Sequence, residues 1–103
     1  MYIELGGKER WVRFDYNAIC DMESRSGLGI MKLMDENAGF NTLRLLLWAG
    51  IKHENKALTP EMVGAWVQEY VNNGGKIEKL FEDAAMELGN SGILGKQQAE
   101  GNS

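Results

Sequence analysis

The stretch Leu43-Arg44-Leu45-Leu46-Leu47-Trp48-Ala49-Gly50-Ile51 decides the fold, because as a helix it would be apolar on nearly every side. If its core-facing side chains are Leu43, Leu46, Leu47 and Ile51, then Leu45, Trp48 and Ala49 point toward the opposite side. Such a helix either lies at the centre of the domain or turns a second apolar face toward a partner protein. The sequence leaves both interpretations open.

Start signals of the same kind place this helix and two others. The predicted N-caps are Asp15 for a helix over about 16–26, Asn41 for 42–53, and Thr59, followed by Pro60, for 60–73. A side-chain oxygen at such a position accepts a backbone N–H at the helix start. Each cap is flanked by an apolar pair that can form a hydrophobic staple: Phe14 and Ile19, Phe40 and Leu45, Leu58 and Val63.

Glycines predict where the helices end. Gly27 follows the first helix and Gly74-Gly75 the third, and Gly89 closes a fourth helix over about 76–88. The fourth helix carries an apolar stripe of Ile77, Leu80, Phe81, Ala84 and Leu88. Residues 29–35 fit one or two short turns. Residues 90–103 are rich in Gly, Ser, Asn and Gln, with only Ile93 and Leu94 to bury, so we expect a flexible tail.

Residues 2–14 predict a β-hairpin that turns at Gly6-Gly7, with Ile3, Leu5, Val12 and Phe14 on the apolar face. An isolated hairpin is marginal in water, so that face must lie on the helices. The predicted fold is α+β and mostly α. A hairpin packs on a bundle of about four helices in one globular domain over residues 1–89.

Composition narrows the class of function. The chain has 103 residues and a net charge of −4, and its Lys and Arg residues are scattered, whereas nucleic-acid binding usually leaves a basic face. Its longest uncharged apolar run, 45–51, is far below the ~20 residues that cross a bilayer. The charged N-terminus does not fit a signal peptide, and one cysteine cannot form an internal disulfide. We therefore expect a cytosolic protein.

The sequence holds no pattern typical of catalysis or metal binding. His53 and Cys20 are the only residues of their kinds, and structural zinc sites need four clustered ligands. We expect His53 to interact with carbonyls at the end of its helix and Cys20 to pack as a small hydrophobe. Four methionines fall at expected core positions, namely Met22, Met31, Met34 and Met62, and Met86 at an exposed one. We predict no enzyme, metal or cofactor.

The third helix repeats the ambiguity of the second, with a wide apolar stripe of Met62, Val63, Trp66, Val67, Tyr70 and Val71. Core packing accounts for such a stripe, but protein interfaces favour exposed aromatic anchors. If the chain binds a partner, we expect the contact along a ridge of Leu45, Trp48, Trp66 and Tyr70.

Two stretches resemble the tail assembly chaperones of long-tailed phages and prophages. The first is Leu5-Gly6-Gly7-Lys8 with Arg13-Phe14-Asp15-Tyr16-Asn17-Ala18-Ile19-Cys20. The second is Leu43-Arg44-Leu45-Leu46-Leu47-Trp48-Ala49-Gly50-Ile51-Lys52-His53-Glu54 with Leu58-Thr59-Pro60-Glu61-Met62-Val63-Gly64. The similarity spans about residues 3–88. No motif in it is catalytic, and the order and spacing carry the match.

The resemblance implies a helper in the host bacterial cytoplasm that coats the tape measure protein, delivers tail tube protein and is absent from the mature virion. It also implies that the chain binds its partner by the helix-in-groove mode and associates weakly with itself along a long partner. No cofactor is implied. The family often makes a longer product by programmed frameshifting, and Leu94-Gly95-Lys96 permits slippery codons.

Two other classes of function stay open. One is a helix-turn-helix DNA-binding regulator, against which the acidic charge and the lack of a row of base-reading side chains argue. The other is a structural head–tail connector subunit, which unlike a chaperone would remain in purified particles.

Overall fold

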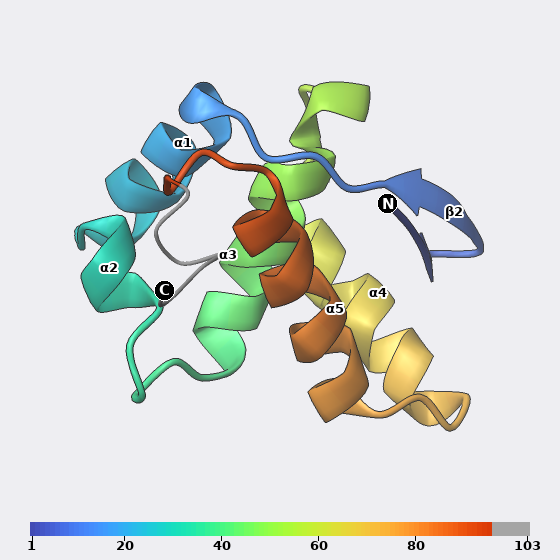
Figure 1. Cartoon of the computed structure of the whole chain (residues 1–103). Helices are drawn as coiled ribbons and strands as arrows, with labels where there is room; N and C mark the ends of the chain where they lie inside the picture. The colour runs from blue at the N-terminus through green and yellow to red at the C-terminus, as the bar shows by residue number, and fades with distance from the viewer. Residues whose placement is uncertain (96–103) are drawn as a thin grey trace.

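The computed structural model describes residues 1–95 and contains an antiparallel hairpin followed by five α-helices (Figure 1). The strands are β1 (Tyr2–Leu5) and β2 (Lys8–Trp11). The helices are α1 (Tyr16–Ser26), α2 (Ile30–Leu33), α3 (Phe40–Ile51), α4 (Pro60–Asn72) and α5 (Ile77–Asn90), and a 3₁₀ turn, η1 (Lys52–Glu54), extends α3. This arrangement confirms the predicted α+β, mostly α, class.

Helix α3 lies at the centre of the molecule. Nine of its twelve residues are buried. It contacts α1, α4, α5 and β2, and Figure 1 shows α1 and α4 on either side of it with α5 crossing in front. The apolar stretch 43–51 is therefore a core helix packed on both sides, the first of the two interpretations that the sequence left open.

The hairpin turns at the predicted glycines. Leu5 pairs with Lys8, leaving Gly6 and Gly7 as a two-residue loop with φ angles of 64° and 83°. A loop with positive φ at both positions matches the twist of the flanking strands and favours glycine. Beyond β2 the chain stays extended and buries Val12 and Phe14 as predicted.

Two of the three predicted caps are confirmed. The Ala18 N–H donates to Asp15 Oδ1 at 2.9 Å, and the Met62 N–H donates to Thr59 Oγ1 at 3.1 Å. The prediction of Asn41 as a cap is wrong, because α3 begins earlier with Gly39 as its N-cap.

A residue inside the helix explains the early start of α3. The Thr42 hydroxyl accepts the Gly39 N–H at 3.2 Å, which is the bond that the third helical residue makes back to the N-cap in a capping box; Gly39 has no side chain to make the other bond. The Asn41 side chain instead accepts from Arg44 Nη2 at 3.3 Å.

The end of α5 also differs from the prediction. Gly89 stays within the helix, which ends at Asn90, and the left-handed φ of 80° falls on Gly92. Ile93 and Leu94 then pack, partly buried, against the core. The rest of the predicted tail, 96–103, lies outside the described residues.

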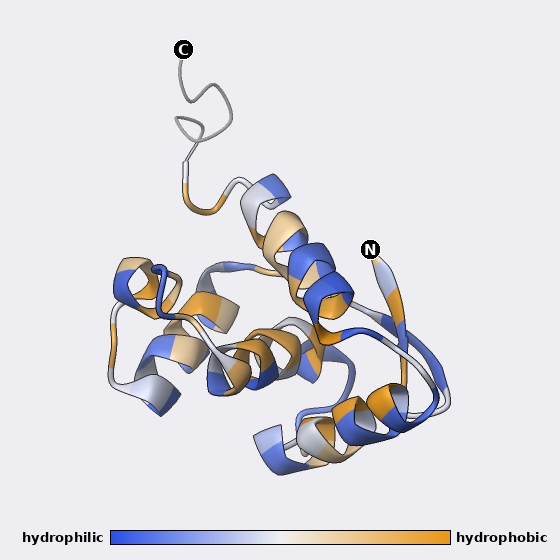
Figure 2. Cartoon of the chain, turned by 90° about the horizontal axis from the view of Figure 1, so that it is seen from below, coloured by the Kyte–Doolittle hydropathy of each residue, from blue (hydrophilic) through white to orange (hydrophobic). Residues whose placement is uncertain are grey.

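Burial around α3 follows the predicted stripes in most places. Along α5, Leu80, Ala84 and Leu88 are buried, and in Figure 2 hydrophobic and hydrophilic residues alternate around the helices that surround α3. Three predicted core side chains are exposed instead: Cys20, Met31 and Met62. Cys20 lies away from the buried face of α1, α2 is a single turn that buries only Leu33, and Met62 stands beside the buried Val63 in the first turn of α4.

Candidate partner-binding surface

Two residues of the predicted ridge are in the core. Leu45 is 2% and Trp48 7% exposed. The Trp48 indole N–H donates to the Leu58 carbonyl at 2.9 Å, which satisfies the one polar group of the buried ring. The prediction that Leu45 and Trp48 face a partner is therefore wrong, because α3 is covered on both sides.

The other two predicted residues, Trp66 and Tyr70, lie together on α4. They line a cleft of about 430 Å³ between the hairpin turn and the C-terminal end of α4, with Glu4 and Glu69 in its wall. Both rings are only partly exposed. The structure thus brings this half of the ridge to a hollow, separated from Leu45 and Trp48.

The chain itself packs against both of these rings. The Arg10 guanidinium lies 3.8 Å from the centre of the Trp66 ring and donates to the carbonyls of Leu5 at 2.8 Å and Gly6 at 3.1 Å. The Tyr70 hydroxyl donates to the Lys76 carbonyl at 3.3 Å, and Gly75 lies against the Tyr70 ring. These contacts fix the hairpin turn and the end of α4, so the two aromatic side chains are structural members of the cleft.

A second hollow is almost entirely apolar. It measures about 350 Å³ and lies where the start of α3, the middle of α4 and the start of α5 meet; we call it the α3–α4 groove. Its lining consists of Phe40, Leu43, Arg44, Gly64, Val67, Gln68, Val71 and Ile77. Arg44 is the one charged residue among them. A hollow of this composition can bury apolar side chains of another protein.

Local structure explains why the groove is open. Because α3 begins at Phe40, this side chain stands on the first helical turn and is 81% exposed. Gly64 has no side chain, and a Cβ placed there would be 3.3 Å from Arg44 Cδ. The Arg44 side chain therefore lies directly against the backbone of α4.

The sequence interpretation missed Phe40 and Arg44 as surface residues. The predicted staple would place the Phe40 ring against Leu45, whereas the ring is exposed, and the sequence pattern predicts no role for Arg44. A signal for Arg44 was present, because a cation flanked by Leu43 and Leu45 must either leave the core or find a partner there.

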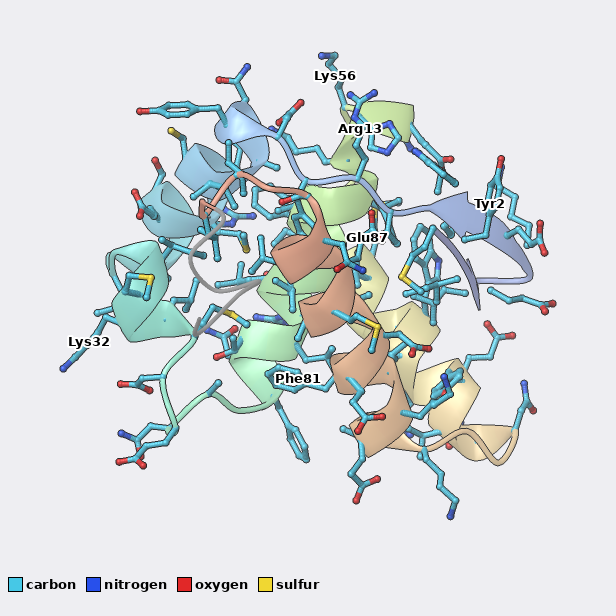
Figure 3. The ribbon with its side chains drawn as sticks, viewed as in Figure 1. Tyr2, Arg13, Lys32, Lys56, Phe81 and Glu87 are labelled. Atoms are coloured by element: carbon cyan, nitrogen blue, oxygen red, sulfur yellow. The ribbon has the colours of Figure 1, made fainter. Side chains whose placement is uncertain are left out.

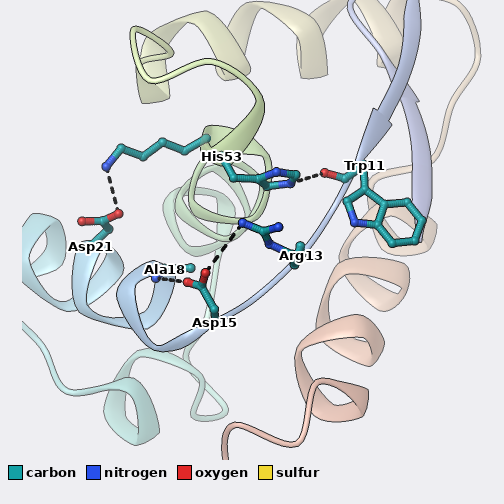
Figure 4. A network of polar contacts seen from close by, with 7 residues as sticks. Trp11, Arg13, Asp15, Ala18, Asp21 and His53 are labelled. Carbon is teal, nitrogen blue, oxygen red and sulfur yellow. Dashed lines mark hydrogen bonds and ion pairs between the residues drawn. The ribbon is translucent and has the colours of Figure 1, made fainter.

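Apart from these two hollows, a network of polar side chains joins the end of α3 to the hairpin and to α1 (Figure 4). His53 Nε2 lies 2.9 Å from the Trp11 carbonyl oxygen, and the Trp11 N–H donates to Glu54 Oε2 at 3.0 Å. Lys52 pairs with Asp21 at 2.9 Å. His53 therefore binds a carbonyl of the hairpin, and not the carbonyls at the end of its own helix as predicted.

Within residues 1–95, no three His, Cys, Asp or Glu side chains are grouped closely enough to hold a metal ion. In the same part of the chain, no helix has both the length and the apolar character needed to cross a bilayer.

No family model, curated protein or solved structure matches this chain.

Proposed function

We propose that this chain is a non-catalytic tail assembly chaperone that binds tape measure protein, tail tube protein or both while a long phage tail is assembled. It acts in the host bacterial cytoplasm and leaves before the virion matures. The proposal starts from the sequence resemblance over about residues 3–88, carried by the hairpin, the first helix and the stretch 43–64.

The observation that supports it best is the α3–α4 groove. A chaperone of this kind has to hold an apolar segment of another protein reversibly, and a groove between helices accepts the apolar face of a partner helix. Phe40 stands at the rim with most of its ring in solvent. An exposed aromatic side chain beside an apolar hollow is the kind of anchor on which binding energy concentrates.

The test is a pull-down of the tagged chain from cells that express the neighbouring tail genes, with mass spectrometry of the captured proteins. We expect the tape measure or tail tube protein among them, and we expect purified virions to lack the chain. Capture of DNA would favour the regulator, and presence in virions with capture of a head protein would favour the connector. Either result would contradict the chaperone.

The same pull-down tests whether the groove is the contact. We expect Phe40→Ala to weaken capture by about 1–2 kcal/mol, roughly tenfold. Stability should hardly change, since the ring is exposed. Tyr16→Ala is the matched control, because it removes another exposed aromatic ring at the start of a different helix, α1. Equal capture by both variants would place the contact elsewhere on the molecule.

A further inference from the structure

Arg44 is placed in the wall of the α3–α4 groove without a full set of acceptors. Its Nε is buried, and within residues 1–95 this atom has no hydrogen-bond partner. One guanidinium nitrogen, Nη2, donates to Asn41 Oδ1 at 3.3 Å. No carboxylate of the described chain forms an ion pair with Arg44. The groove therefore contains a cation whose donors the chain itself satisfies only in part.

This arrangement lowers the stability of the chain when nothing is bound in the groove. A buried donor left without an acceptor carries a desolvation penalty, and the penalty is larger for a charged group. An apolar residue at position 44 would avoid the penalty. An acceptor that a bound molecule places against the terminal nitrogens of the guanidinium would offset part of this cost.

The shape and charge of the groove limit what that molecule can be. Its walls come mainly from two neighbouring helices, α3 and α4, and the space between packed helices takes the side-chain ridge of a third helix. A wholly apolar helix would bury the guanidinium further without pairing it, and a basic helix would repel it. A carboxylate binds a guanidinium with two parallel hydrogen bonds in its favoured geometry.

We propose that the α3–α4 groove binds an amphipathic helix with an aspartate or glutamate within its apolar face, and that Arg44 pairs with that carboxylate. The inference rests on the proposed function, because the helix belongs to the tape measure or tail tube protein. Apolar residues three or four positions apart fill the groove beside Val67 and Val71, and the acidic residue follows at the same spacing on that face.

The experiment measures binding of the full chain to overlapping 20-residue peptides of both tail proteins by isothermal titration calorimetry. We expect the bound peptides to carry this pattern. Replacing the acidic residue by its amide, Glu→Gln or Asp→Asn, should weaken binding at least about tenfold, the loss expected for a buried hydrogen bond to a charged group. This change leaves the chain itself untouched, so it cannot act by unfolding it.

Variants of the chain complete a double-mutant cycle. Arg44→Met should weaken binding of the acidic peptide to the same extent and should have no further effect with the amide peptide. Arg44→Lys keeps the charge without the planar fork and should lie between. Lys32→Met is the control for loss of one positive charge, because Lys32 lies on α2 and points away from the molecule (Figure 3).

The outcomes separate the two proposals. Acidic and amide peptides that bind equally, or a pull-down that recovers the tail proteins while no peptide binds, would overturn the inference and leave the chaperone standing. Recovery of neither tail protein would overturn the chaperone and the inference with it. Self-association that Arg44→Met abolishes would assign the groove to a second copy of the chain, which also overturns the inference.

Discussion

Trp48 shows at the scale of one residue how the apolar centre of the chain tolerates a polar group. Its ring is buried beside leucines, its N–H is bonded to the Leu58 carbonyl, and Arg25 and Lys52 lie 5.4 Å and 5.3 Å from the ring centre. The indole thus joins α3 to the loop that precedes α4.

The prediction for this residue separates ring volume from the hydrogen bond. Trp48→Ala should lower the free energy of unfolding by about 3–5 kcal/mol through loss of packing. Trp48→Phe keeps most of the packing but leaves the Leu58 carbonyl without this donor, which should cost about 1–3 kcal/mol. Urea unfolding followed by circular dichroism measures both.

Trp11→Phe is the control for the Trp48 variants, because the Trp11 ring is partly exposed at the hairpin. It should change the unfolding midpoint little. A Trp48→Phe protein as stable as the unaltered chain would show that the bond to Leu58 contributes nothing.

At the scale of elements, the extended segment after β2 lies directly against α3. The Arg13 N–H donates to the Gly50 carbonyl at 2.8 Å, and a Cβ on Gly50 would lie 2.8 Å from Val12 Cγ1 and 3.1 Å from the nearest atom of the Phe14 ring. Only glycine lets the hairpin and the helix approach this closely.

Two glycine-to-alanine substitutions test that contact, since both positions are helical. Gly50→Ala should lower the free energy of unfolding by about 1–3 kcal/mol, because overpacking outweighs the better helix propensity of alanine. Gly89→Ala meets nothing within 4 Å and should raise stability by about 0.5–1 kcal/mol. Thermal unfolding of the two variants in parallel measures both changes in stability. A Gly50→Ala protein more stable than the unaltered chain would contradict the close contact.

Local signals predicted the helix starts and the hairpin turn correctly where the side chain or backbone of one or two residues sets them. Asp15 and Thr59 each cap a helix with their own side chain, and Gly6-Gly7 alone sets the hairpin loop. The start of α3 was missed because its N-cap is Gly39, which has no side chain to signal a cap; the Gly39 N–H is bonded instead by Thr42, whereas the neighbouring Asn41 carries the side chain expected of a cap.

At the scale of the whole molecule, the candidate site could not be predicted from local pattern. The groove exists because α3 and α4 pack side by side and Gly64 leaves room for Arg44, which is a tertiary arrangement. The predicted ridge failed for the same reason, since Leu45 and Trp48 are buried in a helix that α1, α4 and α5 all contact. Trp66 and Tyr70 were rightly placed together, because they are four residues apart on one helix.

The central position of α3 predicts the order in which the molecule opens. Backbone amides of Leu46, Leu47 and Ile51 should exchange with solvent only through global unfolding, and those of the one-turn helix α2 through local opening. Native-state hydrogen exchange measured by NMR at increasing urea concentrations tests this. Exchange of α3 amides at the rate of α2 would show that the helices do not share one cooperative core.

The separate environments of the three tryptophans also give the chain its own optical reporters. Trp48 lies in the core, Trp66 lies under Arg10 in the cleft, and Trp11 lies partly exposed with the Tyr2 ring 4.7 Å away. A variant that keeps Trp48 alone should emit at shorter wavelength than one that keeps Trp11 alone, and its emission should follow unfolding. Because the α3–α4 groove contains no tryptophan, a tryptophan carried by a bound helix would be read most clearly in a chain whose own three had been replaced by phenylalanine.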